Sequence, residues 1–278
     1  MNRLALATLA AVCVASSLAA PAAADDFDSI KSAGKITVAT EAAFKPFEYV
    51  EDGKIVGFGA DLLAEVVSDM GVEVEQLDLP FQGILAGLAA GQYDMIATSV
   101  AINPERAATY AYTRPIASIE NVVVTLESDQ PLTALSDLNG LVVGSQLGSS
   151  TEAVAREIDA GLKAEGGEGF SDLRLYQTFP DTAFALRSGQ VDAIVIGNIT
   201  AGEFNLASPG TFRVDLTYGD PVLLAWVVRP GNPKLLAAVN GTITRLAESG
   251  ELDALQEKWI GTATGSPAEG YLPEGAVQ

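Results

Sequence analysis

Leu88-Ala89-Ala90-Gly91-Gln92-Tyr93-Asp94-Met95-Ile96 is repeated later in the chain as Leu186-Arg187-Ser188-Gly189-Gln190-Val191-Asp192-Ala193-Ile194. Each copy ends an apolar helical pattern at Gly and Gln and then begins a β-prone run through Asp. Glycine suits the left-handed position that closes a helix, and the apolar run after Asp is typical of a buried parallel strand. Two copies of one helix-to-strand unit predict two similar α/β lobes, and small molecules bind in clefts between lobes.

The segments around the first copy predict one lobe. Strands are expected at 35–40, 72–77 and 95–99, with helices at 62–70 and 83–90 between them. This β-α-β-α-β order is typical of an open parallel sheet with helices on both faces. The valine-rich stretch 116–126 then reads as an extended segment that crosses to a second lobe.

The same order begins again after the crossing. Strands are expected at 141–144, 173–176 and 193–196, helices at 154–162 and 182–188, and a second crossing at 221–228. Two crossings predict two open sheets joined by a two-segment hinge. We therefore expect a first lobe made of 25–119 and 226–278 and a second lobe made of 120–225.

Residues 1–24 have the pattern of an export signal. Arg3 supplies the positive start, 4–18 the apolar middle and 22–24 the small cleavage site. Cys13 follows Val12 rather than a small residue, which argues against lipid attachment. Cleavage after Ala24 leaves a mature chain without cysteine, and we expect it to work in the periplasm.

The composition excludes several classes of function. The chain has 16 Lys and Arg against 36 Asp and Glu, a net charge of −20, so it repels nucleic acid and anionic lipid. It has no histidine, which excludes a Ser-His-Asp triad and the usual zinc sites. Gly57-Phe58-Gly59 begins like a dinucleotide loop but lacks the final glycine. We expect a monomer without cofactor or metal.

Ligands of open α/β sheets bind beyond the carboxyl ends of the strands. The polar and aromatic residues near the ends of the predicted strands are therefore the candidates for a site: Glu41, Phe44, Phe81, Ser99, Arg106, Gln146 and Ser150.

Arg106 is the strongest of these candidates. Asn103 as cap and Pro104 at the first helical position start a short helix, and a guanidinium grips a carboxylate with two parallel hydrogen bonds. The alternative is a surface arginine paired with Glu105. The helix after Gly148-Ser149-Ser150 could likewise offer free N–H groups to an anion, or simply have a serine cap.

The remaining candidates have alternatives too. Phe44 and Phe81 could enclose an apolar or cationic group, or they belong to the core. Glu41 could receive a ligand cation or be a plain loop carboxylate. Asp61 is expected to cap a helix rather than touch a ligand.

In several stretches the chain resembles the periplasmic solute-binding family that serves ABC importers of polar amino acids. The resemblance spans about 35–261 and rests on these segments: Ile36-Thr37-Val38-Ala39-Thr40-Glu41, Pro46-Phe47-Glu48, Gly53-Lys54-Ile55-Val56-Gly57-Phe58, Asp61-Leu62, Tyr93-Asp94, Pro104-Glu105-Arg106, Val143-Gly144, Gly148-Ser149-Ser150, Gly231-Asn232-Pro233 and Glu257-Lys258-Trp259-Ile260-Gly261. It implies a type II periplasmic-binding-protein fold whose two lobes close on one zwitterionic solute and hand it to a membrane permease.

The resemblance also implies roles for single residues. The arginine at 106 holds the ligand carboxylate, helped by backbone N–H groups at Ala101 and Ser150. Phe44 and Phe81 sandwich the ligand side chain, and Glu41 can take a distal ammonium.

Two positions depart from the family pattern. Relatives that bind α-amino acids carry Asp where this chain has Gly197, and Ser or Thr where it has Ala101. A buried ammonium without an anionic partner is costly. Either Asn198 or Glu41 supplies the missing contact to an ordinary amino acid, or the ligand is a substituted or cyclic amine such as an ectoine, a betaine or an opine.

Two other classes of function stay open at this point. Secreted prephenate-type dehydratases share the fold that the resemblance implies, and Glu41 is the one general acid that the sequence offers for such chemistry. A sensor domain uses the same kind of trap, and it would need a separate signalling partner.

Overall fold

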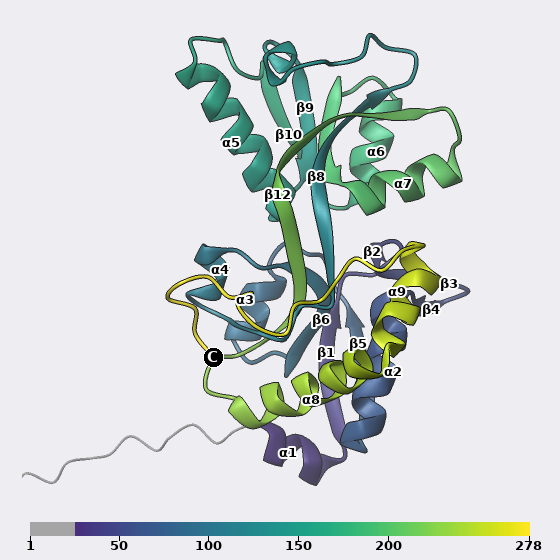
Figure 1. Ribbon diagram of the computed structural model, residues 1–278, viewed down its shortest axis with the longest axis vertical. Helices are drawn as coiled ribbons and strands as arrows, with labels where there is room; N and C mark the ends of the chain where they lie inside the picture. The colour runs from purple at the N-terminus through teal and green to yellow at the C-terminus, as the bar shows by residue number, and fades with distance from the viewer. Residues whose placement is uncertain (1–25) are drawn as a thin grey trace, which may run out of the picture.

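The chain, described by a computed structural model over residues 26–278, folds into two α/β lobes joined by two long strands (Figure 1). The predicted export segment and Cys13 lie outside the described residues. The two crossing strands are β8 (Ala117–Leu126) and β12 (Phe212–Val228). The lower lobe in Figure 1 contains both the first segment of the chain and its last helices, as the predicted double crossing requires.

The lower lobe has a parallel core of three strands with helices around it. Its elements in chain order are α1 (Asp26–Ala33), β1 (Lys35–Thr40), β2 (Ala43–Phe44), β3 (Glu48–Glu51), β4 (Lys54–Val56), α2 (Phe58–Met70), β5 (Glu73–Asp78), α3 (Ile84–Ala89), β6 (Met95–Ala101), α4 (Pro104–Ala107), β7 (Ala111–Tyr112), and, after the second crossing, α8 (Pro233–Ser249) and α9 (Glu251–Ile260). β1 pairs in parallel with both β5 and β6.

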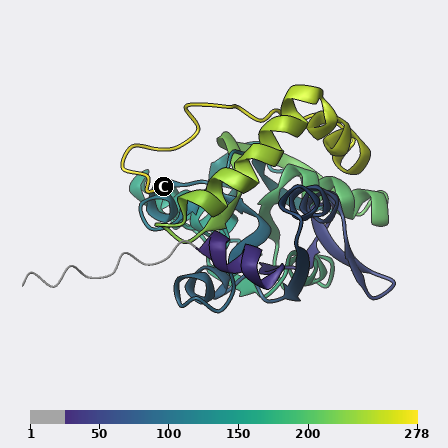
Figure 2. The same cartoon turned by 90° about the horizontal axis from the view of Figure 1, so that it is seen from below.

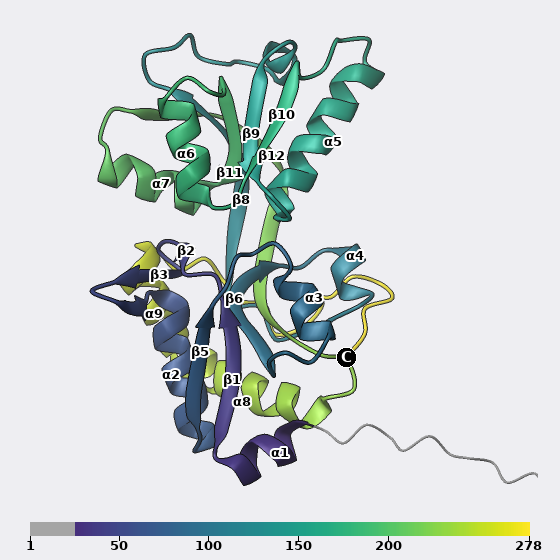
Figure 3. The same ribbon diagram turned by 180° about the vertical axis from the view of Figure 1, so that it is seen from behind.

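The upper lobe repeats this plan on a smaller scale (Figure 3). Its elements are η1 (Leu135–Leu138), β9 (Val142–Gln146), α5 (Ser150–Ala164), β10 (Asp172–Tyr176), α6 (Phe179–Arg187), β11 (Ala193–Gly197) and α7 (Asn198–Ala207). β9 is the central strand and pairs in parallel with β10 and β11. The helix α7 and the small sheet β2-β3-β4 were not predicted.

Strand pairing continues from one lobe into the other. The sheet order is β10-β9-β11-β8-β12-β6-β1-β5, with β7 also paired to β12. β12 runs antiparallel to β8 along most of its length and then pairs with β6, so the crossing strands join the two predicted sheets edge to edge. The predicted lobe boundaries, 119/120 and 225/226, fall inside β8 and β12.

The two copies of the sequence repeat have the same glycine conformation and make the same aspartate hydrogen bond. Gly91 and Gly189 have φ angles of 70° and 71°, the left-handed conformation predicted for the end of each helix. Asp94 Oδ2 accepts a hydrogen bond from Thr37 N at 2.8 Å, and Asp192 Oδ2 accepts one from Val142 N at the same distance. Each aspartate thus fastens its strand to the first strand of its own lobe.

The two glycines of Gly57-Phe58-Gly59 leave room for close packing, Gly57 against the backbone of Pro46 and Phe47 and Gly59 against the Glu48 side chain. Phe58 N donates to Pro46 O at 3.1 Å and Gly59 N donates to Phe47 O at 2.9 Å, which holds the start of α2 against the preceding loop. A Cβ at Gly57, whose φ is 120°, would lie 2.8 Å from Pro46 O and closer still to Phe47 O. The Gly57-Phe58-Gly59 motif therefore serves the packing of α2 against the preceding loop.

Replacing Gly57 by alanine should destabilise the fold through both the clash and the backbone strain. Because the clashing atoms belong to the backbone and cannot swing away, we expect a loss of about 3 kcal/mol of unfolding free energy. Urea denaturation followed by circular dichroism measures this. Gly53→Ala, at a positive φ but with open space around its Cβ, is the control and should cost less. Equal losses for both variants would contradict the role given to the contact.

The carboxyl-terminal elements complete the lower lobe. The sequence predicted that Asp61 caps a helix, and this prediction is wrong. Asp61 Oδ2 instead accepts from Lys258 Nζ at 2.6 Å and from Trp259 Nε1 at 2.7 Å. Trp226 is fully buried in the core rather than facing a cleft.

The chain after α9 returns across the lower lobe towards α4 (Figure 2). Along the way Ser118 Oγ, on β8, donates to Thr264 O at 2.8 Å, and Val277 N donates to Ala107 O at 2.8 Å. This tail therefore contacts both a crossing strand and the helix that carries Arg106. Between residues 26 and 278, no helix combines the length and the apolar character that a membrane crossing needs.

Candidate functional site

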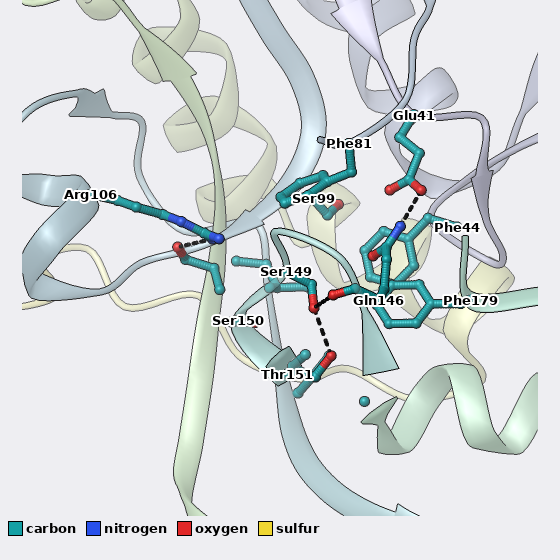
Figure 4. A pocket seen from close by; sticks show the side chains of 14 residues that line it. Glu41, Phe44, Phe81, Ser99, Arg106, Gln146, Ser149, Ser150, Thr151 and Phe179 are labelled. Carbon is teal, nitrogen blue, oxygen red and sulfur yellow. Dashed lines mark hydrogen bonds between the residues drawn. The ribbon is translucent and has the colours of Figure 1, made fainter. Parts of the chain in front are cut away.

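A cavity lies between the two lobes, next to the crossing strands (Figure 4). The residues that line it are Glu41, Phe44, Phe81, Ser99, Ala101, Arg106, Ile119, Gln146, Ser149, Ser150, Thr151, Phe179, Gly197 and Leu224. All the candidates named from the sequence are among them except Asn198. The enclosed volume is about 30 Å³, the size of one or two water molecules, so the lobes are closed on each other.

Arg106 reaches the cavity from α4 in the way the sequence predicted. Asn103 caps this helix by accepting from Arg106 N at 2.8 Å, with Pro104 at its first position. The guanidinium donates to Gly148 O of the upper lobe at 2.8 Å and lies 5.6 Å from the centre of the Phe81 ring. No carboxylate within the described residues forms an ion pair with it, Glu105 included, and burial lowers its pKa. A cation is therefore held at the cavity without an acidic partner.

Glu41 is the second charged group of the cavity, and it is 2% exposed. Its Oε1 accepts a hydrogen bond from Nε2 of Gln146, which also donates to Gln177 O at 3.1 Å. Burial raises the pKa of Glu41 to about 8, the charge of Asp78 adds to the rise, and the bond from Gln146 opposes it. The carboxyl group is thus protonated at neutral pH in this arrangement, and a cation beside it would favour its ionised form.

Three phenylalanines form the aromatic part of the wall. The rings of Phe44 and Phe179 lie 5.1 Å apart at 35°, and Phe44 also packs on Phe47 at 4.7 Å. Phe81 stands between Arg106 and Glu41 in Figure 4. Phe44 and Phe81 line the cavity and also pack in the hydrophobic core. Both alternatives that the sequence left open, a place in the wall of a site and a place in the core, therefore hold for them.

The start of α5 faces the cavity from the upper lobe. Ser149 caps the helix by accepting from Glu152 N at 3.1 Å, and its own hydroxyl donates to Gln146 O at 2.7 Å. α5 begins at Ser150, so the first N–H groups of the helix have no intrahelical acceptor. The site therefore offers both a guanidinium and a helix N-terminus to an anion.

A buried glutamate that the sequence analysis did not select supports the floor of the cavity. Glu48 is fully buried, and its carboxyl group accepts from Ser99 Oγ and Thr98 Oγ1 at 3.1 Å and from Ser99 N at 3.3 Å. Burial raises the pKa of Glu48 to about 8, against the effect of these three bonds. Glu48 does not line the cavity itself, but it fixes Ser99, which does.

The two raised pKa values predict that the ligand-free protein loses stability between pH 5 and pH 8. A glutamate in the unfolded chain ionises near 4.5, whereas Glu41 and Glu48 keep their protons until about pH 8 when folded. In this window the folded state binds more protons, so rising pH favours unfolding. We expect the melting temperature at pH 5.5 to exceed that at pH 8 by several degrees, and Glu48→Gln to flatten part of the slope. A melting temperature that rises with pH in both proteins would contradict the assignment.

Five of the lining residues were not among the candidates selected from the sequence: Ile119, Ser149, Thr151, Phe179 and Leu224. Phe179 follows the end of β10, so the rule of strand ends could have found it. Ile119 and Leu224 lie on the crossing strands, where the sequence carried no signal of which side chains face the cavity. Asn198, which was predicted, starts α7 and its Oδ1 accepts from Glu120 N at 3.0 Å and Ile199 N at 2.9 Å instead.

No group of three or more His, Cys, Asp or Glu residues in the described part of the chain has the arrangement of a metal site. The chemistry that the cavity offers is therefore that of its side chains: one guanidinium, one carboxyl group, hydroxyls, one carboxamide and aromatic rings.

Comparison with known proteins gives the chain a family. The sequence model of the bacterial extracellular solute-binding proteins, family 3, matches residues 36–262. The L-cystine-binding protein TcyJ of Escherichia coli (strain K12) is 28% identical over 266 residues, which cover 94% of this chain and 96% of that protein. The arginine-binding extracellular protein ArtP of Bacillus subtilis (strain 168) is 27% identical and covers 92% of this chain and 97% of its own length.

Solved structures agree with this assignment. The amino acid ABC transporter substrate-binding protein AbpA of Streptococcus pneumoniae, bound to L-arginine, has a TM-score of 0.75, is 30% identical, and covers 86% of this chain and 99% of its own. The ancestral amino acid-binding protein AncCDT-1, a precursor of cyclohexadienyl dehydratase, has a TM-score of 0.76 at 26% identity, covering 85% and 100%. The chain has the two-lobed type II periplasmic-binding-protein fold, and it belongs to the bacterial extracellular solute-binding proteins of family 3.

Proposed function

We propose that this protein captures an amino acid or a similar zwitterion between its two lobes and delivers it to the permease of an ABC importer. The observation that carries this proposal is Arg106. Its guanidinium lines the cavity with no acidic partner among the described residues, beside the start of α5. A ligand carboxylate is the group that would pair with the guanidinium by two charge-assisted hydrogen bonds, with the helix N-terminus in support.

Capture requires the lobes to separate and close again. The enclosed volume of about 30 Å³ is too small for an amino acid. Two contacts between the lobes hold this closed arrangement, the hydrogen bond from Gln146 to Glu41 and that from Arg106 to Gly148. We place the hinge in β8 and β12, at the boundaries 119/120 and 225/226, because these strands connect the lobes. A bound ligand then favours the closed form over the open one.

The ligand contacts follow from this placement. Arg106, with the N–H groups of Ala101 and Ser150, would hold the carboxylate; Glu41 would take the cation; and Phe44 and Phe81 would flank the body of the ligand. Ser99, Gln146 and Gly197 complete the wall. Asn198 is left out, because it does not line the cavity and its carbonyl oxygen has two donors already.

A screen of the refolded, ligand-stripped protein tests the proposal. A ligand that binds only the folded state raises the melting temperature through mass action. The panel contains the common L-amino acids, ectoines, betaines and opines, and each hit is followed by isothermal titration calorimetry. We expect at least one zwitterion to raise the melting temperature by several degrees and to bind with one-to-one stoichiometry. A complete absence of shifts would contradict the proposal.

We also propose that the protein binds its ligand without changing it. The relatives named above are binding proteins, although one structural relative is a precursor of a dehydratase. The cavity offers one protonated carboxyl group, on Glu41, as an acid. Incubation with prephenate-like acids and with each hit, followed by chromatography, should return the compounds unchanged. Loss of carbon dioxide or water from any of them would show an enzyme.

Export by residues 1–24 and a monomeric state belong to the same proposal. Mass spectrometry of the protein recovered from the periplasm of an expressing cell should find Asp25 as its first residue. Size-exclusion chromatography with light scattering should give the mass of one chain. A precursor retained in the cell, or a stable dimer, would overturn the respective part.

A further inference from the structure

The charges on the wall of the cavity limit the charge of its ligand. Among the described residues that line the cavity, Glu41 carries the only acidic side chain and Arg106 the only basic one. They come from different strand ends of the lower lobe, and the Phe81 ring lies between them in Figure 4. The wall therefore matches one negative and one positive charge on a ligand.

Two further carboxyl groups near Glu41, those of Glu48 and Asp78, are not among the described residues that line the cavity. Glu48 is fully buried behind Ser99, where three donors occupy its carboxyl group. Asp78, which acts on Glu41 through its charge, does not line the cavity, and its Oδ1 accepts from Ala42 N at 3.0 Å. These two acidic side chains are thus either bonded within the fold or outside the wall of the cavity.

The other polar groups of the wall are neutral, and several of its hydroxyls bond to one another or to the lower-lobe carboxyl group of Glu48. Ser149 Oγ lies 2.9 Å from Thr151 Oγ1 and donates to Gln146 O. Thr151 Oγ1 also lies 3.0 Å from Ser145 Oγ, and Ser99 Oγ donates to Glu48. An ammonium needs up to three acceptors. The hydroxyl oxygens keep lone pairs for a cation, but neutral oxygens do not neutralise a second positive charge in the closed cavity.

We propose that the cavity accepts carboxylate solutes with one positive charge and rejects those with two. This inference rests on the proposed function and adds the substrate class. A cation taken from water into the closed cavity without a carboxylate partner loses hydration that nothing replaces. The single permitted cation lies beside Glu41, where the rings of Phe44, Phe81 and Phe179 add the attraction of their faces. Solutes with cationic side chains, such as arginine and lysine, are therefore poor ligands.

Matched ligand pairs test the inference by calorimetry on the ligand-stripped wild-type protein. The pairs differ in one charge at nearly constant shape: arginine with citrulline, lysine with norleucine, and 2,4-diaminobutyrate with 2-aminobutyrate. Because the three pairs differ in size, a cavity too small for the larger compounds can still be tested with the smaller pair. In every pair of which a member binds, we expect the singly charged member to bind at least tenfold more tightly. A doubly charged member that binds as tightly as its partner overturns the inference.

The outcomes keep this inference apart from the proposed function. If doubly charged members bind well, the inference fails and capture of a zwitterion stands. If compounds of the wider panel bind but no member of these pairs does, the charge of each bound compound tests the inference. Compounds with a single positive charge support it, and a compound with two positive charges overturns it. If no compound binds at all, the proposed function fails and the inference fails with it.

A variant that adds the missing charge gives a second test. Gly197 lines the cavity, and a Cβ there would meet Ile119 Cδ1 at 3.1 Å, the end of a flexible side chain. Gly197→Asp should raise the affinity for arginine relative to citrulline at least tenfold over the same ratio in Gly197→Asn. The asparagine variant has the same shape without the charge. An equal ratio in the two variants would overturn the claim that a missing carboxylate excludes the second cation.

Discussion

Arg106→Ala is expected to weaken binding of the carboxylate ligand by about 100- to 1,000-fold. Removing one partner of a buried, hydrogen-bonded charge pair costs about 3–4 kcal/mol, because the other charge is left in the cavity without compensation. The effect should appear mainly as faster dissociation, since most affinity changes at a given site are in the off-rate. Calorimetry for the affinity, and stopped-flow release for the rate, measure it.

Arg174→Ala is the matched control for this variant. Arg174 lies on β10, away from the cavity, and forms an exposed ion pair with Asp172 at 3.0 Å. An exposed pair contributes little, so this variant should bind like the wild type. Thermal melting of the ligand-free Arg106→Ala protein shows whether the fold survives. Binding that falls less than tenfold in a folded Arg106→Ala protein would contradict the role given to Arg106.

Glu48→Ala should cause the largest loss of stability. Its removal leaves a void in the core and takes the acceptor from three donors, Ser99 N, Ser99 Oγ and Thr98 Oγ1. Voids and unsatisfied buried donors together cost about 3–5 kcal/mol. For a chain of this size that corresponds to a fall of roughly 10 °C in melting temperature. Differential scanning calorimetry at pH 6 measures this fall.

Glu51→Ala, on the same strand, controls for the chemistry of the substitution. Glu51 is exposed at the end of β3, so its removal should change the stability by no more than about 0.5 kcal/mol. Glu48→Gln should fall between the two, since it keeps one carbonyl acceptor. The account of Glu48 as the support of Ser99 would be wrong if Glu48→Ala melted like Glu51→Ala.

The sequence predicted the fold well because the lobes repeat a local pattern. The glycine of each copy acts at the end of its own helix, so its effect is visible in the sequence. Each aspartate, in contrast, bonds to the first strand of its lobe, which lies 57 or 50 residues away in the chain. The continuity of the sheet through β8 and β12 was not predictable. It depends on which strands meet when the two lobes assemble, and this pairing joins residues about a hundred positions apart.

The site was predictable to the extent that it follows the ends of parallel strands. Gln146 is the last residue of β9 and Arg106 lies on the short helix that follows β6, so a general rule about the strand ends of α/β sheets applies to both. Glu48 could not be recognised, because a glutamate in a short stretch with Pro46 and Phe47 looks like an exposed residue. Only the packed structure shows that the Thr98–Ser99 segment surrounds its carboxyl group.

Asp61 shows the converse error. Its place near a helix start predicted a cap, but its partners Lys258 and Trp259 are about two hundred residues away in the chain. The sequence pattern suggested a partner near Asp61 in the chain, whereas its actual partners come from a distant helix. The same limit applies to Asn198, whose carbonyl oxygen accepts from the backbone N–H groups of Glu120 and Ile199.

A crystal structure of the protein with its tightest zwitterionic ligand tests the central claim most directly. We expect the ligand between the lobes, with its carboxylate at hydrogen-bond distance from the Arg106 guanidinium and its cation beside Glu41. Gln146 would then have moved or would share Glu41 with the ligand. A ligand bound elsewhere, or one whose carboxylate makes no contact with Arg106, would contradict the account.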